Sequence, residues 1–261
     1  MAQGNLATLL KDEGKLDEAL ATYQDVYRVF EELGDKVNIA AVLGQISKVH
    51  MNKGNFNRAI EVQEASLDIS REIGDGPGRA KGLHQLSMLY RNKEDYDRAL
   101  ETSKEAEALV RKLGFEHGIS ITLHEQGLIL SQMDRPEEAF ARFQESLEIK
   151  QRIGDEVGTA DSLCEISKLL MDAGQIRDAI AVFTECLNVY RRLDDPVKTG
   201  SILELLGNVH ELQGEYQAAL EKYQQALALK RKYMPAESVA LTERNIARVR
   251  EKLEQEKKDQ S

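Results

Sequence analysis

The sequence predicts an all-α protein, a right-handed α-solenoid in which helical pairs stack one after another. Two observations support this prediction. Only four of the 261 residues are proline, and residues that favour helices, such as Ala, Leu, Glu, Lys, Gln and Arg, dominate the chain. In addition, one turn pattern recurs at a constant interval of 40 residues. A fixed interval of this kind is typical of repeat architectures, in which each repeat buries its apolar face against its neighbours.

Three columns of residues define the repeat. A turn position and a small position five residues later both recur six times, and a second turn position recurs five times. The first turn column is Gly14, Gly54, Glu94, Asp134, Gly174 and Gly214. The small column is Ala19, Ala59, Ala99, Ala139, Ala179 and Ala219. The second turn column is Gly34, Gly74, Gly114, Gly154 and Asp194, often followed by Asp.

Each unit is expected to hold two helices. In the second unit, Val42, Ile46 and Val49 form one buried face at helical spacing. Gly54 then ends the first helix in a left-handed conformation, and Asn55 is placed to cap the second. The predicted units are 1–34 (with a short first helix), 35–74, 75–114, 115–154, 155–194 and 195–233. A capping helix over 234–254, with apolar residues Val239, Leu241, Ile246, Val249 and Leu253, and a disordered tail over 255–261 follow them.

A further small column lies on the first helix of each unit. It consists of Ala7, Ser47, Ser87, Gly127, Ser167 and Gly207. Together with the alanine column it lets the paired helices approach to about 8–10 Å.

This pattern, which reads LLGNVHELQGEYQAALEKYQQAL in the sixth unit, resembles the tetratricopeptide repeat over residues 2–233. The usual repeat has about 34 residues, whereas this one has 40. The longer form is similar to arrays in kinesin light chains, spindle-orientation adaptors, and bacterial regulators and sensors. Trp is absent, and leucines such as Leu83 and Leu123 take its place. The resemblance implies a concave groove lined by the first helix of each unit.

The candidate site residues are those first-helix positions that do not point into the core. They are Lys48, Met51, Asn52, Lys81, His84, Met88, Arg91, Asn92, Ile121, His124, Leu128, Gln132, Lys168, Asp172, Glu204, Asn208 and Glu211. Cations and amides gather in the second and third units, and carboxylates in the fifth and sixth. We therefore expect a groove that is positive at one end and acidic at the other. The alternative is a solvated helix face without a ligand.

Composition argues against several other classes. A net charge of −10 disfavours nucleic acid and anionic membranes as partners. No apolar run is long enough to span a bilayer, and no signal peptide is recognisable. Two cysteines do not make a disulfide scaffold, so a cytoplasmic location is expected. His84, His124 and Cys164 form a column, but helices about 8–10 Å apart are too distant for all three to share one metal ion.

We therefore expect a non-catalytic scaffold without a cofactor that binds a partner peptide or helix in its groove. Charge reversal at Lys48, Arg91 or Lys168 should weaken binding without lowering the melting temperature. The alternative is the sensor or regulatory segment of a larger signalling protein, peptide-sensing or ATPase-linked. The short first helix also leaves two interpretations open, a piece of a longer array or a genuinely short helix. Self-association through this uncapped end is a further expectation.

Overall fold

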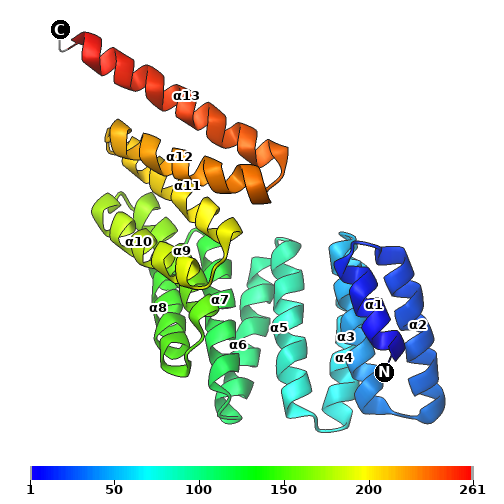
Figure 1. Ribbon diagram of the computed structural model, residues 1–261. Coiled ribbons are helices and arrows are strands. Elements are labelled where there is room, and N and C mark those ends of the chain that lie inside the picture. Colours follow the sequence, from blue (N-terminus) through cyan, green and yellow to red (C-terminus); the bar gives the residue numbers. More distant parts are fainter. Residues whose placement is uncertain (1, 260–261) are drawn as a thin grey trace. The chain divides into compact units, whose positions relative to one another are not determined.

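The computed structural model describes residues 2–259, and within this range every regular element is an α-helix (Figure 1). The all-α prediction is therefore confirmed. The helices of the described residues are α1 (Ala2–Asp12), α2 (Leu16–Leu33), α3 (Lys36–Asn52), α4 (Phe56–Glu72), α5 (Gly76–Asn92), α6 (Tyr96–Lys112), α7 (Glu116–Gln132), α8 (Pro136–Ile153), α9 (Glu156–Asp172), α10 (Ile176–Arg192), α11 (Pro196–Leu212), α12 (Tyr216–Tyr233) and α13 (Ala236–Asp259).

The first turn column, which recurs every 40 residues, marks positions where the backbone is left-handed. Gly54 has φ +74°, and its amide bonds the Met51 carbonyl at 2.9 Å. Glu94 and Asp134 keep the same conformation, with φ of 64° and 56°, although they are not glycines. Because this conformation is unfavourable for residues with a Cβ atom, the column is mostly glycine. The recurrence thus reflects helix termination.

The aspartates that follow the second turn column cap the next helix. The side chain of Asp35 accepts the Asn38 amide at 3.1 Å, and that of Asp75 accepts the Gly78 amide at 2.9 Å. Asn55, by contrast, occupies an N-cap position but makes no capping hydrogen bond through its side chain. The capping role predicted for Asn55 is therefore wrong. These aspartates satisfy backbone amides that the first turn of a helix leaves without a partner.

The two small columns meet where paired helices cross. All six alanines of the small column are fully buried. The hydroxyls of Ser47 and Ser87 donate to the carbonyls of Ala59 and Ala99, at 2.8 and 3.0 Å. A Cβ atom on Gly207 would lie 2.5 Å from the Tyr223 ring, so no larger residue fits there. The predicted close approach of the paired helices is confirmed.

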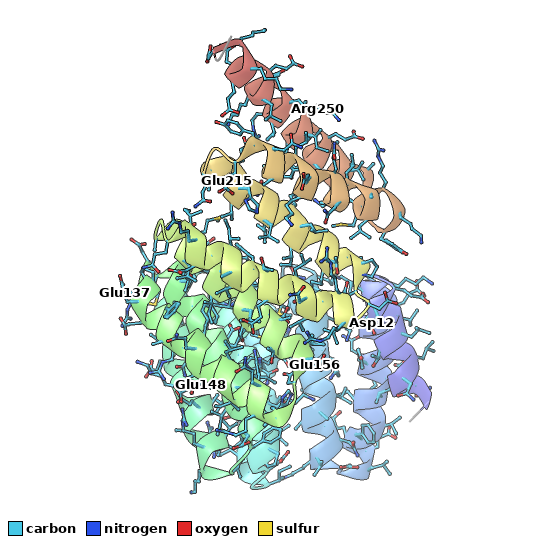
Figure 2. All side chains as sticks on the ribbon, turned by 60° about the vertical axis from the view of Figure 1, so that its left-hand side comes forward. Asp12, Glu137, Glu148, Glu156, Glu215 and Arg250 are labelled. Atoms are coloured by element: carbon cyan, nitrogen blue, oxygen red, sulfur yellow. The ribbon has the colours of Figure 1, made fainter. Side chains whose placement is uncertain are left out.

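The chain forms two compact units, Met1–Arg142 and Phe143–Ser261, and the division falls inside α8. In the first unit each helix from α1 to α7 packs on the next, and α5 also contacts the odd helices on either side of it, α3 and α7. In the second unit the same sequential packing runs from α9 to α13. Tyr23 lies in a core cluster of the first unit, and Phe183 in one of the second. Charged side chains such as Glu137, Glu156 and Arg250 are exposed (Figure 2).

Helix α13 packs against α12 through Ile246 and Val249, which are buried with Tyr223. The predicted apolar face is wrong at Leu241, which is 45% exposed, because Thr242 takes the buried position at helical spacing from Ile246 and Val249. The tail expected to be disordered is helical as far as Asp259, since its Glu, Gln and Lys residues favour helices. Residues 260 and 261 lie outside the described residues. Across residues 2–259, no helix combines the length and apolarity that crossing a bilayer requires.

Candidate partner-binding face

The predicted site residues of the first unit lie on α3, α5 and α7, and we call this surface the odd-helix face. None of them is buried. Those that are half-buried are Lys48, Met51, His84, Met88, Arg91, Ile121, His124 and Leu128. Those that are exposed are Asn52, Lys81, Asn92 and Gln132. Partial burial of this kind is expected for side chains that contact a neighbouring helix and also reach solvent.

A polar pocket of about 220 Å³ lies between α3, α4 and α5. Gly44 of α3, Gln63 of α4, and Lys81 and Gln85 of α5 line it. The Gln85 side-chain amide donates to the Gly44 carbonyl at 2.8 Å. The Gln63 side chain is 1% exposed, and its Oε1 atom has no hydrogen-bond partner among the described residues. The pocket therefore offers an unused acceptor at a buried position.

A second, mainly apolar pocket of about 300 Å³ lies between α5 and α7. Its lining includes His84 of α5, Ile121 of α7, and Phe115 from the turn before α7. Phe115 is 53% exposed, a high value for a large aromatic side chain. Lys81 lines both pockets. The odd-helix face thus carries two adjacent pockets of different chemistry with one cation between them.

The charged side chains that line these pockets are Lys81 and Asp75, and Asp75 already accepts the Gly78 amide as the cap of α5. Burial lowers the pKa of Lys48, and the nearby charges of Lys81 and Lys11 lower it further. Neither Lys48 nor Lys81 forms an ion pair with any residue in the described range. Burial also lowers the pKa of His84, with Glu125 opposing this effect and Lys48 adding to it. Cations that repel one another and have no carboxylate partner favour an anionic or electron-rich ligand.

Arg91 behaves differently from the other predicted cations. Its Nε atom donates to Glu125 Oε1 at 2.7 Å, and the two side chains are only 17% and 4% exposed. Removing Arg91 would leave the buried Glu125 carboxylate without its ion-pair partner, which is strongly destabilising. The expectation that charge reversal at Arg91 leaves the melting temperature unchanged is therefore wrong. Arg91 joins α5 to α7.

In the second unit, the predicted acidic residues are engaged within the fold. Lys230 and Thr242 donate to Glu204, at 2.5 and 2.6 Å. Glu211 accepts from Arg248 and Lys252 of α13. Cations of this unit thus already neutralise both carboxylates. The expectation of an acidic region open to a partner is wrong at these two positions.

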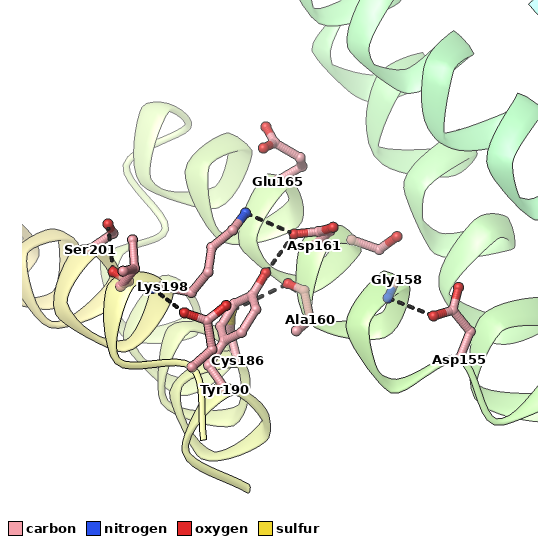
Figure 3. A network of polar contacts seen from close by, with 12 residues as sticks. Asp155, Gly158, Ala160, Asp161, Glu165, Cys186, Tyr190, Lys198 and Ser201 are labelled. Carbon is pink, nitrogen blue, oxygen red and sulfur yellow. Dashed lines mark hydrogen bonds and ion pairs between the residues drawn. The ribbon is translucent and has the colours of Figure 1, made fainter. Parts of the chain in front are cut away.

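Other polar residues of the second unit are also paired. Asp161 accepts from the Tyr190 hydroxyl at 2.5 Å and lies 3.4 Å from the Lys198 ammonium (Figure 3). Lys168 pairs with Glu165 at 2.7 Å, one turn away on α9. The predicted Asn208 lies 2.7 Å from the Tyr223 hydroxyl. Of the predicted residues here, Asp172 is the exposed one.

Within residues 2–259, no three or more His, Cys, Asp or Glu side chains form a group that could hold a metal ion. Cys186 is fully buried and donates its thiol to the Ala160 carbonyl at 3.3 Å, as Figure 3 shows. Its packing between α9 and α10 accounts for a small residue at this position.

Stacked pairs of antiparallel helices, small residues at each crossing and pockets between successive odd helices define a helical-repeat protein of the binding type. The tetratricopeptide-repeat family profile matches residues 38–112, 118–192 and 165–232. The chain therefore belongs to the tetratricopeptide-repeat family, as its sequence resemblance predicted. Arrays of this family are in general non-catalytic interaction scaffolds, and the match indicates no catalytic family. A comparison with curated protein sequences finds no match.

Several solved structures share the fold. BtubC from P. vanneervenii superposes with a TM-score of 0.76 at 19% identity, covering 84% of this chain and 94% of that one. A Rap protein complexed with competence and sporulation factor has a TM-score of 0.68 at 13% identity, covering 95% and 74%. A signal transduction ATPase with a tetratricopeptide-repeat sensor, from Pyrococcus horikoshii, has a TM-score of 0.73 at 14% identity, covering 96% and 41%. At these identities the similarity concerns the fold.

Proposed function

We propose that this protein is an interaction scaffold whose odd-helix face binds an extended peptide segment of a partner protein. The observation that carries the proposal is the pair of neighbouring pockets in the first unit, one polar and one apolar, which share Lys81. A face of solvated side chains alone would not need the hollows found between α3 and α5 and between α5 and α7. Two neighbouring pockets can take two side chains of one bound peptide.

The spacing of the pockets suits an extended chain. Packed helices lie about 8–10 Å apart, and a polyproline II segment advances about 3.1 Å per residue with three residues per turn. One turn of such a peptide therefore spans about one interhelical step. Side chains three residues apart would enter the two pockets from the same side of the peptide. Lys48 and Lys81 favour a segment that is neutral or acidic.

The comparisons support a peptide ligand without identifying it. The Rap structure is a complex with competence and sporulation factor, so an array of the same fold binds that factor. The partner of the present chain is proposed from its own pockets and charges. The predicted residues on the second unit are a weaker part of the proposal, because Glu204 and Glu211 already have partners within the unit.

The test first selects dodecapeptides from a random display library with the full chain as bait. Binding of the selected peptides is then compared between the parent protein and its charge-reversal variants. Lys48→Glu and Lys81→Glu should each weaken binding by about ten-fold or more, measured by fluorescence anisotropy. Lys104→Glu, an exposed lysine on α6, is the matched control and should leave binding within about two-fold of the parent. Selected peptides that bind all three variants equally well would exclude this face as the binding surface.

A second candidate is the sensor segment of a signalling protein. It is favoured by the similarity to the ATPase sensor, in which the aligned region is 41% of the longer chain. The discriminating observation is the sequence of the whole gene product. An adjoining nucleotide-binding or DNA-binding domain would support the sensor role, and its absence from the full-length protein would support a free-standing scaffold.

Self-association is proposed for the outer side of α1. Leu6 and Leu9 are 49% and 56% exposed there, at one helical turn of spacing. Apolar side chains at this spacing suit another helix. Light scattering on the full chain tests the idea. Leu9→Glu should shift any dimer to monomer, whereas a parent protein that is monomeric at high concentration would exclude it.

A further inference from the structure

The polar pocket between α3, α4 and α5 contains a buried hydrogen-bond acceptor that has no donor among the described residues. Gln63 Oε1 is buried and unpartnered within the described residues. A buried acceptor without a donor is unfavourable, so a native structure normally fills such a position with water or a ligand. The pocket is large enough for either, at about 220 Å³.

A second acceptor converges on the same space. Gln85 uses its amide nitrogen on the Gly44 carbonyl, at 2.8 Å, which fixes the orientation of its side chain. A Cβ atom built on Gly44 would lie 3.9 Å from Gln63 Oε1 and 4.0 Å from Gln85 Oε1. Two carbonyl oxygens from different helices therefore face the volume above Gly44. A group entering this volume must offer hydrogen-bond donors.

Gly44 creates that volume. The equivalent position of the later repeats holds His84, His124, Cys164 and Glu204. Any of these side chains on α3 would occupy the space between the two acceptors. Gly44 is helical, and a Cβ atom built on it would meet no atom closer than 3.9 Å, so neither backbone strain nor tight packing demands a glycine. The absence of a side chain at Gly44 therefore leaves space for a group of a bound ligand.

We propose that this pocket binds a primary carboxamide, the side chain of an asparagine or glutamine in the partner segment. The inference rests on the proposed function. A carboxamide nitrogen has two hydrogens to donate, one for each acceptor oxygen. Its carbonyl oxygen would face the mouth, where the exposed Lys81 ammonium donates. A carboxylate would place its oxygens against the two acceptors, and a cationic group would meet the Lys81 ammonium.

The test uses small probes on the full chain, so that no partner need be known. N-acetyl-glutamine N-methylamide is titrated while the side-chain carboxamide resonances of Gln63 and Gln85 are followed by nuclear magnetic resonance. Saturable shifts in the millimolar range are expected, in keeping with the few atoms that a small probe contributes. N-acetyl-glutamate N-methylamide should bind about ten-fold more weakly or worse.

Two variants and one control complete the experiment. Gly44→Leu fills the pocket and should abolish the shifts. Gln63→Met removes the acceptor while keeping a side chain of similar length, and should weaken the probe by about ten-fold at the Gln85 resonance. Gly4→Leu, at the equivalent position of α1, has no neighbour within 4 Å and should have no effect. If Gly44→Leu does not fold, Gln63→Met decides.

Two results would overturn the proposal. Absence of saturable shifts with either probe would mean that the pocket holds only solvent. Equal binding of the amide and the acid, or binding that survives Gln63→Met, would mean that no carboxamide recognition occurs. Both results are distinguishable from failure of the proposed function. A face that binds selected peptides in a Lys81-dependent manner, while the probe shows no shifts, would retain the scaffold role and lose this pocket.

Discussion

Glu211 anchors the C-terminal helix α13, although its position in the repeat had suggested a role in partner binding. Arg248 donates to its two carboxylate oxygens through Nε and Nη2, at 2.8 Å each, and Lys252 Nζ lies 2.9 Å away. The Tyr223 hydroxyl adds a contact at 2.9 Å. The hydrogen bond from Arg248, followed by those from Lys252 and Tyr223, lowers the pKa of Glu211 to about 2.

Glu211→Gln keeps the shape of the side chain and removes its charge. Hydrogen bonds to charged groups contribute about 1.5–3 kcal/mol. The cations are half exposed, at 50% for Arg248 and 42% for Lys252, so they regain water when the charge is lost. We therefore expect α13 docking to weaken by about 2 kcal/mol, near the lower end of that range. This corresponds to about 30-fold in the equilibrium for local opening.

Amide hydrogen exchange measures that opening directly. Amides of α13 near Ile246 and Val249 should exchange about 30-fold faster in Glu211→Gln, while those of α5 in the first unit keep their rates. The matched control is Glu243→Gln. It breaks the exposed pair between Glu243 and Arg231, which also joins α13 to α12, at 2.8 Å. An exposed pair should change exchange by about two-fold at most. Equal rates in the two variants would refute the anchoring role.

The remaining predictions concern stability. The folded-state pKa of Glu211 lies below its unfolded value of about 4.3, so the stability that Glu211 contributes is full above that pH and is lost as the pH falls toward 2. The difference in melting temperature between the parent and Glu211→Gln should therefore shrink as the pH falls from about 4.3 to 2. A constant difference would contradict the anchoring role of Glu211. Arg91→Leu leaves a buried carboxylate unpaired and should lower stability by about 3 kcal/mol in thermal melts, the lower end of the range for breaking a buried pair. Arg58→Leu, whose pair is exposed, should cost under about 0.5 kcal/mol. Equal melting temperatures for these two variants would count against the buried pair. Glu94→Gly should stabilise the chain by about 1 kcal/mol and Gly54→Ala destabilise it by about the same, because both positions have positive φ; urea midpoints that move in one direction for both would contradict this.

The periodic features of the sequence predict most of the fold. A column such as Ala59 and Ala99 recurs because each repeat needs a small residue at the same helix crossing, and local geometry is the same in every copy. The positive φ of the turn column follows for the same reason. Asn55 shows the limit of this reasoning, since a residue type suited to capping need not make the bond.

The site was predicted less well because its character depends on contacts between helices. Glu211 occupies an odd-helix position like the others, but its partner Arg248 lies 37 residues further along the chain. Helical periodicity places a residue on a face and says nothing of which cation stands opposite. The buried Arg91–Glu125 pair was missed for the same reason.

The polar pocket is a further feature that helical periodicity alone does not predict. Gln63 lies four residues after the buried Ala59, but only the packing of α3, α4 and α5 shows that its Oε1 atom lacks a donor. A signal was present in the sequence: a glutamine lies at a core position of α4, and Gly44 stands in a column that holds His, Cys or Glu in the later repeats. That combination identifies a candidate pocket only once the neighbouring helix is in place.

The central claim is that a partner peptide lies on the odd-helix face of the first unit. Photo-crosslinking tests it most directly, with p-benzoyl-phenylalanine replacing Met88 on α5 or, as the control, Lys104 on α6. Met88 is half-buried on the odd-helix face, and Lys104 is exposed on the helix behind it. The account predicts that a selected peptide crosslinks at position 88 and not at position 104. Crosslinking at 104 alone, under conditions where the peptide is bound, would contradict it.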